Sequence, residues 1–159
     1  MIQFLVPLFG AAYIADRATN WHPPVKCPKA RGIDPLGSGG FGASRDGGSR
    51  LHKGLDIVSK PGQTVYAPIG GVLYTFATEK GLRGVQIRGE NGDVAKVIYL
   101  RPFLESGSIV SKGQEVGEAV DIVPFYGRGI TNHVHFEAII DGVSLNPVKK
   151  LPLLTRMLL

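Results

Sequence analysis

The sequence of 159 residues predicts an all-β protein: a compact antiparallel sheet or sandwich domain, with an irregular N-terminal arm and an apolar C-terminal tail. Three observations support this fold class. Between Leu51 and Leu145 the chain contains short runs of β-branched and aromatic residues bounded by turn residues. Its 22 glycines and 11 prolines show no collagen-like period and indicate many short connections. The same stretch contains no long amphipathic helix and no internal repeat, which favours antiparallel strands.

The expected strands follow one another closely along this stretch. They are Gly54–Val58, Thr64–Ala67, Gly71–Ala77, Gly84–Arg88, Val94–Leu100, Val116–Ala119, His133–Ile140 and Val143–Leu145. Asn91-Gly92 lies between the fourth and fifth strands and Asp141-Gly142 between the last two, and both pairs are typical of tight hairpin turns. Upstream, residues 16–35 carry several prolines and predict an irregular lead-in, and the stretch from Gly37 to Gly48 predicts a loop.

The length suits one folded domain, flanked by two apolar ends. We predict an arm and lead-in at residues 1–35, the domain at residues 36–149 and a tail at residues 150–159. Met1–Ala15 lacks the basic start of a secretory signal, so no cleaved signal peptide is expected. The segment is also shorter than the roughly 20 residues of a membrane-spanning helix. Met1–Ala15 and Leu151–Leu159 are therefore predicted to contact a protein partner or a membrane.

Charge and cysteine content restrict the function classes. The net charge of +5 favours an anionic partner such as a bacterial wall polymer. The basic residues are scattered, and the nearest approach to a cluster, Lys26, Lys29 and Arg31, is interpreted as a solvated face, so no nucleic-acid partner is predicted. The single cysteine, Cys27, excludes an internal disulfide and is expected to be a small buried side chain.

Three of the four histidines fall into two short motifs. His133 and His135 are two residues apart on an expected strand, so their side chains project from the same face. An isolated pair of this kind is equally consistent with surface histidines. His52 and Asp56 form the other motif, and two imidazole nitrogens with one carboxylate oxygen make a tetrahedral zinc set with one open position. Water at that position has a pKa near 7, although iron or manganese also fits these donors.

These motifs resemble those of the lysostaphin-like zinc metalloendopeptidases, which cleave peptides of bacterial peptidoglycan. The resemblance covers residues 36–149 and rests on His-x-x-x-Asp followed much later by His-x-His. Other stretches of the chain are similar to the family in the same order: Gly40–Arg45, Gly62–Pro68, Gly70–Val72, Val110–Gly117 and Asn146-Pro147. The resemblance implies a β-rich fold of the duplicated hybrid motif type and one zinc ion per chain.

Carried over residue by residue, the resemblance makes His52, Asp56 and His135 the zinc ligands and His133 a catalytic histidine. Glu137 shares a strand face with His135, and two interpretations stay open: it orients an imidazole, or it is simply solvated. One departure matters, because Arg101 stands where the family carries another catalytic histidine. Arginine stays protonated and cannot act as a base, but it could donate hydrogen bonds to an oxyanion.

Two functions follow from these expectations. The first is a zinc metalloendopeptidase acting on peptidoglycan peptides, extracytoplasmic or associated with a phage virion or tail. The second is a zinc-binding structural or binding module of the same fold that has lost turnover, as the substitution at Arg101 suggests. A non-catalytic vertebrate chemotaxin of this fold is similar in carrying a basic residue and then proline there. A latent form, with Cys27, His22 or Asn20 completing the zinc site, is a third possibility.

Overall fold

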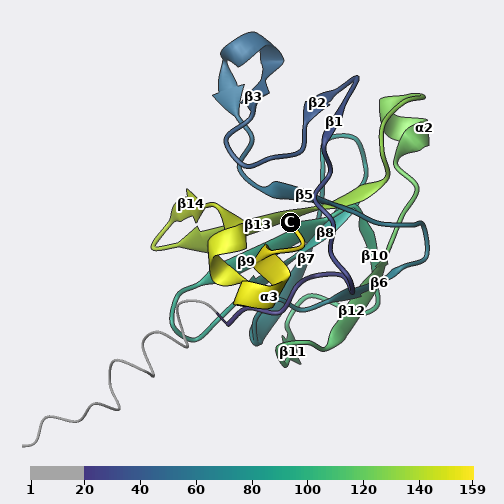
Figure 1. Cartoon of the computed structure of the whole chain (residues 1–159). Helices are drawn as coiled ribbons and strands as arrows, with labels where there is room; N and C mark the ends of the chain where they lie inside the picture. Colours follow the sequence, from purple (N-terminus) through teal and green to yellow (C-terminus); the bar gives the residue numbers. More distant parts are fainter. Residues whose placement is uncertain (1–19) are drawn as a thin grey trace, which may run out of the picture.

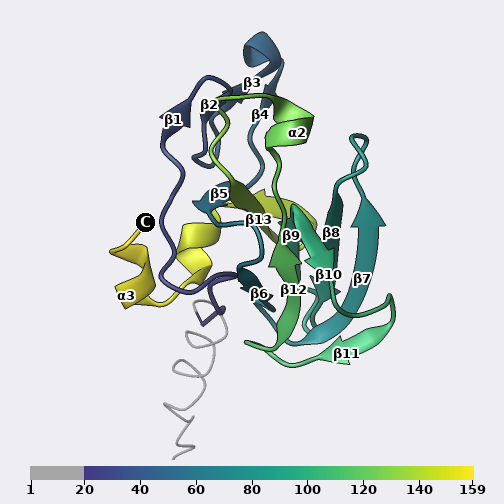
Figure 2. The same ribbon diagram turned by 90° about the vertical axis from the view of Figure 1, so that its right-hand side faces the viewer.

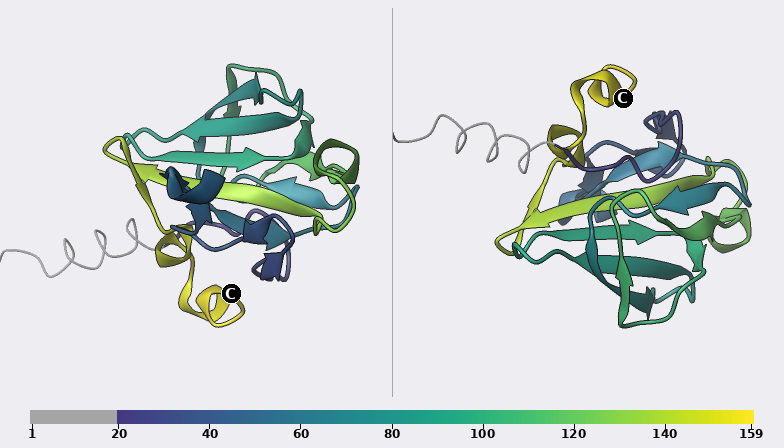
Figure 3. Two further views of the ribbon diagram at one scale, coloured as in Figure 1. Left: turned by 90° about the horizontal axis from the view of Figure 1, so that it is seen from above. Right: turned by 90° about the horizontal axis from the view of Figure 1, so that it is seen from below.

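The computed structural model describes residues 20–159, and the apolar segment Met1–Ala15 lies outside them. An antiparallel seven-stranded sheet forms the centre of the molecule (Figure 1). Its spatial order is β11 (Ser108–Val110), β7 (Gly71–Ala77), β8 (Arg83–Arg88), β9 (Val94–Ile98), β13 (His133–Ile140) and β14 (Val143–Leu145). The seventh strand, β5 (Leu55–Val58), also pairs with β13. Seen from above and below, β13, β9, β8 and β7 lie side by side (Figure 3).

Smaller elements surround this sheet. A three-stranded sheet contains β10 (Leu100–Pro102), β12 (Glu115–Ala119) and β6 (Thr64–Tyr66). Two short hairpins are β1 (Ile33–Asp34) with β2 (Gly37–Ser38), and β3 (Ser44–Arg45) with β4 (Arg50–Leu51). The helical turns are η1 (Asp46–Gly48), α2 (Val123–Tyr126), η2 (Pro147–Lys150) and α3 (Leu153–Arg156). Both hairpins and α2 lie toward the same end of the molecule, beyond β5 (Figures 1 and 2).

The predicted all-β fold is confirmed, and most strand positions agree with the sequence. β7, β13 and β14 have the expected bounds, and β5, β6, β8 and β12 differ by one residue at one end. The expected strand Val94–Leu100 is instead divided into β9 and β10, because Tyr99 has a φ of 73°. β11 was not predicted. The turn at Asp141-Gly142 is a two-residue hairpin in which both residues have positive φ, 50° and 78°.

Residues of the lead-in and the tail pack into the same hydrophobic core as the strands. Trp21, Val25 and Leu151 are buried with the strand residues, and the Trp21 ring lies 6.2 Å from that of Phe136. Leu159 also packs against this core. The tail therefore buries part of its apolar surface within its own chain, whereas Met157 and Leu158 remain exposed. No helix among residues 20–159 combines the length and apolarity needed to span a membrane.

Strand alternation on β13 separates the core from the site. Val134, Phe136 and Ala138 are fully buried in the core. His133 and His135 project from the opposite face, as their two-residue spacing predicts. β13 thus contributes core residues from one face and candidate site residues from the other.

Candidate metal centre

Antiparallel pairing of β5 with β13 places the two histidine-containing motifs side by side. Asp56 lies directly opposite His135 in this register. His52 precedes β5 and reaches the same point across Gly54, where the chain runs very close to β13. A Cβ atom on Gly54 would lie 2.5 Å from the Phe136 carbonyl oxygen and 2.7 Å from His135 Nε2. Only glycine therefore allows His52 to approach His135 here.

We expect Gly54→Ala to lower the free energy of unfolding by about 1–3 kcal/mol, because the added methyl group must displace backbone or a buried imidazole. Urea denaturation of the metal-free chain measures this change. Gly92→Ala is a useful comparison, since its Cβ would meet nothing within 4 Å and its strain comes only from a φ of 86°. Equal stability of Gly54→Ala and the wild type would contradict the close approach.

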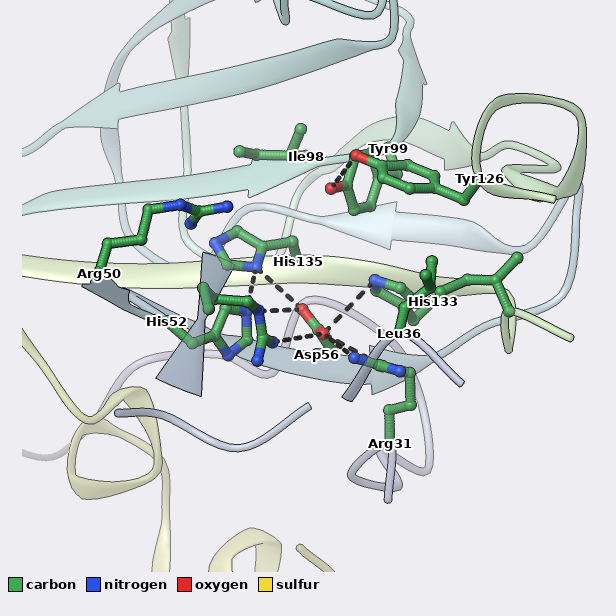
Figure 4. A pocket seen from close by; sticks show the side chains of 12 residues that line it. Arg31, Leu36, Arg50, His52, Asp56, Ile98, Tyr99, Tyr126, His133 and His135 are labelled. Carbon is green, nitrogen blue, oxygen red and sulfur yellow. Dashed lines mark hydrogen bonds and ion pairs between the residues drawn. The ribbon is translucent and has the colours of Figure 1, made fainter. Parts of the chain in front are cut away.

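Three donor atoms converge at this point (Figure 4). His52 Nε2 lies 2.9 Å from His135 Nδ1, which lies 2.9 Å from Asp56 Oδ1. The third side, from His52 Nε2 to Asp56 Oδ1, measures 3.1 Å. Donors about 2.0–2.2 Å from a tetrahedral zinc ion are roughly 3.3 Å apart, so the triangle has nearly the size that zinc requires. The structure brings together the three residues predicted as ligands.

The outward nitrogens of both imidazoles have acceptors of their own. His52 Nδ1 lies 2.7 Å from the Gly40 carbonyl oxygen, and His135 Nε2 lies 3.1 Å from Glu137 Oε1. Each outward nitrogen therefore donates its proton to an oxygen, which leaves the lone pair of the other nitrogen directed at the cluster. Glu137 is buried, so the structure favours the interpretation in which it orients His135 over the one in which it is simply solvated.

The electrostatics of the cluster favour a positive charge among its donors. Burial would raise the pKa of Asp56, but hydrogen bonds from His135 and His52 and the charge of nearby histidines hold it well below its usual range. For His135, burial lowers the pKa, and contacts with Asp56 and Glu137 more than compensate and raise it. A metal cation would supply the charge that these groups favour. The donor set thus fits zinc in number, type and spacing.

His133 lies beside the cluster but is oriented differently. Its Nδ1 lies 2.6 Å from the Thr131 carbonyl oxygen, and its Nε2 lies 3.5 Å from Asp56 Oδ2. Burial lowers the pKa of His133 and outweighs the opposing effects of Asp56 and the Thr131 carbonyl. The side chain is therefore a neutral imidazole at neutral pH that donates through Nδ1 and keeps the Nε2 lone pair. This is the form that a general base requires.

An open cavity of about 320 Å³ contains the cluster and His133. Tyr99 and Tyr126 line one part of it, and their hydroxyl oxygens lie 2.8 Å apart (Figure 4). The Tyr99 ring also meets the His133 ring edge-on, with centroids 5.3 Å apart. Burial and the Tyr126 hydroxyl raise the pKa of Tyr99, so it stays a protonated donor. The other lining residues are Arg31, Leu36, Arg45, Arg50, Ile98 and Ile130.

The structure does not bring Arg101 to this cavity. Arg101 lies on β10 opposite Glu118 of β12, and two of its nitrogens contact Glu118 Oε1 at 3.0 and 2.8 Å. Its side chain is 62% exposed and packs over Phe103. The cross-strand ion pair holds the guanidinium on the surface, where it does not line the cavity. Its predicted contribution to an oxyanion site has no geometric support.

The side chains suggested for a latent form also lie elsewhere. Cys27 is exposed, so its expected burial is wrong, and it does not line the cavity. His22 packs on Tyr66 at a ring distance of 5.5 Å, on the side of the three-stranded sheet. Asn20 lines a separate cavity near Lys112. None of these three side chains completes the cluster.

Sequence reasoning missed several residues of the cavity. Arg31 was interpreted as part of a solvated face, yet it is only 4% exposed, because Asp34 and Asp56 compensate its charge. The aspartate three residues after Arg31 was the available signal. Tyr99 stands two residues before Arg101, and no role was predicted for it. Tyr126 carried no signal, since it lies in the short helical turn α2 between β12 and β13, outside the histidine-containing motifs.

Comparison with known proteins relates this chain to peptidases and to two vertebrate proteins. The model of Peptidase family M23 matches residues 50–147. Myeloid protein 1 of Gallus gallus is 39% identical over 113 residues, covering 67% of this chain and 34% of that protein. Leukocyte cell-derived chemotaxin-2 of Bos taurus is 34% identical over 114 residues, covering 67% of this chain and 71% of that protein. DD-carboxypeptidase/endopeptidase Mpg of Neisseria meningitidis serogroup B is 37% identical over 101 residues, covering 62% of this chain and 22% of that protein.

A solved structure supports the same fold. The catalytic domain of the antimicrobial peptidase lysostaphin from Staphylococcus simulans superposes with a TM-score of 0.55 at 19% identity, covering 68% of this chain and 85% of that one. The predicted lysostaphin-like resemblance is therefore confirmed. The family match includes both histidine-containing motifs and extends over more than half of the sequence. The chain belongs to peptidase family M23, a family of metallopeptidases.

Proposed function

We propose that this protein is a zinc metalloendopeptidase that cleaves peptide cross-links of bacterial peptidoglycan. One zinc ion per chain would be held by His52, Asp56 and His135. The observation that carries the proposal is the pairing of this three-donor cluster with the neutral imidazole of His133 in one open cavity. A structural metal site would need no free histidine beside it.

Zinc bound at the cluster would polarise a carbonyl group and lower the pKa of water in its open coordination position. The side chains of this protein perform the other tasks. His133 accepts a proton through Nε2 and returns it to the leaving amine, while the Thr131 carbonyl holds its ring in place. The hydroxyl pair of Tyr99 and Tyr126 supplies a donor on another part of the cavity lining. Glu137 keeps the His135 ring aligned.

Charge and location agree with a wall substrate. Arg45 and Arg50 line the cavity, and the chain carries a net charge of +5, which suits an anionic polymer. Peptidoglycan lies outside the cytoplasm, so the activity would be extracytoplasmic. A virion or tail component would meet the same substrate during entry into a cell. The apolar tail adds little support for such mounting, because Leu151 and Leu159 pack on the core of their own chain.

The test is hydrolysis of purified bacterial peptidoglycan by the full, zinc-loaded chain. We expect soluble fragments with new amino groups, detected by mass spectrometry, and no fragments after treatment with a chelator. Restoring zinc should restore release. A chain that binds one zinc ion but releases nothing from walls of different cross-link chemistry would contradict the proposal.

A zinc-binding module without turnover is the second candidate, and one observation favours it. Arg101 replaces the expected histidine and is held on the surface by Glu118, so the cavity contains one free histidine rather than two. This candidate predicts that the zinc-loaded chain sediments with peptidoglycan without cutting it. Release of fragments by the wild type would exclude it.

A further inference from the structure

One buried side chain of the lead-in contacts the candidate metal site. Arg31 precedes β1 and is only 4% exposed, although it carries a full positive charge. Its guanidinium group lies against Asp56, one of the three candidate ligands (Figure 4). We propose that Arg31 is a positioning residue that makes Asp56 a one-oxygen metal ligand. The inference rests on the proposed zinc site and not on turnover.

The contacts divide the two oxygens of Asp56 between two roles. Arg31 Nε and Nη2 both donate to Asp56 Oδ2, at 3.1 and 2.9 Å. Asp56 Oδ1 faces the imidazoles, 2.9 Å from His135 Nδ1 and 3.1 Å from His52 Nε2. With Oδ2 occupied by two charge-assisted hydrogen bonds, only Oδ1 remains for a metal. A tetrahedral site with an open position requires this one-oxygen arrangement, because a second oxygen would take up that position.

The main chain fixes the guanidinium relative to Asp56. Arg31 N donates to the Asp56 carbonyl oxygen at 2.8 Å, and Asp56 N donates to the Gly39 carbonyl oxygen at 2.9 Å. Gly39 N in turn donates to the Gly32 carbonyl oxygen at 3.0 Å. A Cβ on Gly39 would lie 2.6 Å from the Arg31 carbonyl oxygen and 3.0 Å from Asp56 Cβ. The lead-in, the loop and β5 are therefore packed too closely for Arg31 to shift independently.

Asp34 extends the same contacts to the candidate catalytic histidine. Arg31 Nη1 forms an ion pair with Asp34 Oδ2, and that oxygen also accepts a hydrogen bond from Thr131 N at 3.1 Å. The Thr131 carbonyl oxygen accepts the Nδ1 proton of His133. One continuous set of contacts thus holds both Asp56 and His133. Arg31 thus has two carboxylate partners, and the effect proposed here is on the orientation of Asp56.

A lysine could not replace Arg31 in this arrangement. The planar guanidinium presents several donors at fixed angles, and here they reach two carboxylates at once. A lysine ammonium is a point charge without that fixed geometry. An arginine-to-lysine change therefore keeps the positive charge and removes the fixed donor geometry, so it tests positioning separately from charge.

The experiment measures zinc affinity and coordination in the full chain, using competition with a chromophoric chelator. We expect Arg31→Met and Arg31→Lys each to raise the Kd for zinc about 10–100-fold, the usual effect of removing a residue that orients a ligand. Loading with Co²⁺ gives a second readout that does not depend on activity. In both variants, visible absorption should weaken as Asp56 Oδ2 joins the metal and the coordination number rises. Arg88→Met, which removes a surface charge stacked on Tyr74, should match the wild type.

The possible outcomes separate the hypotheses. If the wild type binds zinc and Arg31→Lys has the same Kd for zinc and the same Co²⁺ spectrum, a positive charge is sufficient at this position. That result overturns the positioning role, while the proposed function stands. If the wild type binds no zinc, both proposals fail. Should neither Arg31 variant fold, Asp34→Asn provides the test, because its amide would oppose the donors of Arg31 and Thr131. An unchanged Kd in that variant would overturn the inference.

Discussion

The variant His133→Ala is expected to cleave peptidoglycan roughly 10²–10⁴ times more slowly than the wild type, the usual cost of losing a proton-transfer group. In the wild type, His133 Nε2 lies 3.5 Å from Asp56 Oδ2, and burial lowers the pKa of His133 and keeps the ring neutral, while the Thr131 carbonyl holds the ring in place. The side chain makes no contribution to the three-donor triangle. Rate should therefore fall while zinc content remains at one ion per chain. Initial rates of amino-group release and metal analysis of the same sample measure both quantities.

His22→Ala is the matched control for this variant. His22 packs on Tyr66 and Gly113, outside the cavity, so its removal should leave the rate of cleavage unchanged. A rate for His133→Ala within twofold of the wild type would remove His133 from the mechanism. Loss of zinc from that variant would instead show that His133 is a ligand.

Removing the Asp56 carboxylate is expected to have the largest effect on the fold and the site together. Asp56→Ala should bind no zinc at stoichiometric concentration, and its metal-free form should lose about 1–3 kcal/mol of unfolding free energy, because a buried charge loses one of its two carboxylate partners and two of its nitrogens lose their acceptor. That charge is the guanidinium of Arg31, whose side chain is 3% exposed. Metal analysis after gel filtration measures the first effect. Urea denaturation in the presence of chelator measures the second.

Glu118→Ala is the appropriate comparison for Asp56→Ala. It also removes a carboxylate paired with an arginine, but the Arg101 side chain is 62% exposed. Such surface pairs contribute about 0–1 kcal/mol. Equal destabilisation by the two substitutions would show that Arg31 is not a buried charge dependent on Asp56.

Strand positions could be predicted where alternation was regular. β13 and β14 follow the hydrophobic pattern and the Asp141-Gly142 turn, and both have the predicted bounds. The division between β9 and β10 could not be predicted, because a tyrosine rarely adopts the positive φ of Tyr99. β11 was missed since it is short and its central residue, Ile109, is 83% exposed. Its position depends on pairing with β7, which local sequence does not encode.

The candidate site was predictable where its residues form short motifs. The register of β5 and β13 brings together His52, Asp56 and His135. The spacings His-x-x-x-Asp and His-x-His mark these residues in the sequence. The contact between Arg31 and Asp56 was not predictable, because the two residues are 25 positions apart in the chain. Arg101 was predicted at the site from its position in the sequence. Its ion pair with Glu118 on a neighbouring strand instead holds it on the surface.

The packing of the lead-in has a consequence for transplanting this domain. The segment that matches the family, residues 50–147, leaves out part of the packed core. A fragment limited to that segment would lack Trp21, Val25 and Leu151 from its core. It would also lack Arg31 beside Asp56. A chimera intended to carry this site into another protein should therefore begin no later than residue 20 and retain the residues that follow β14.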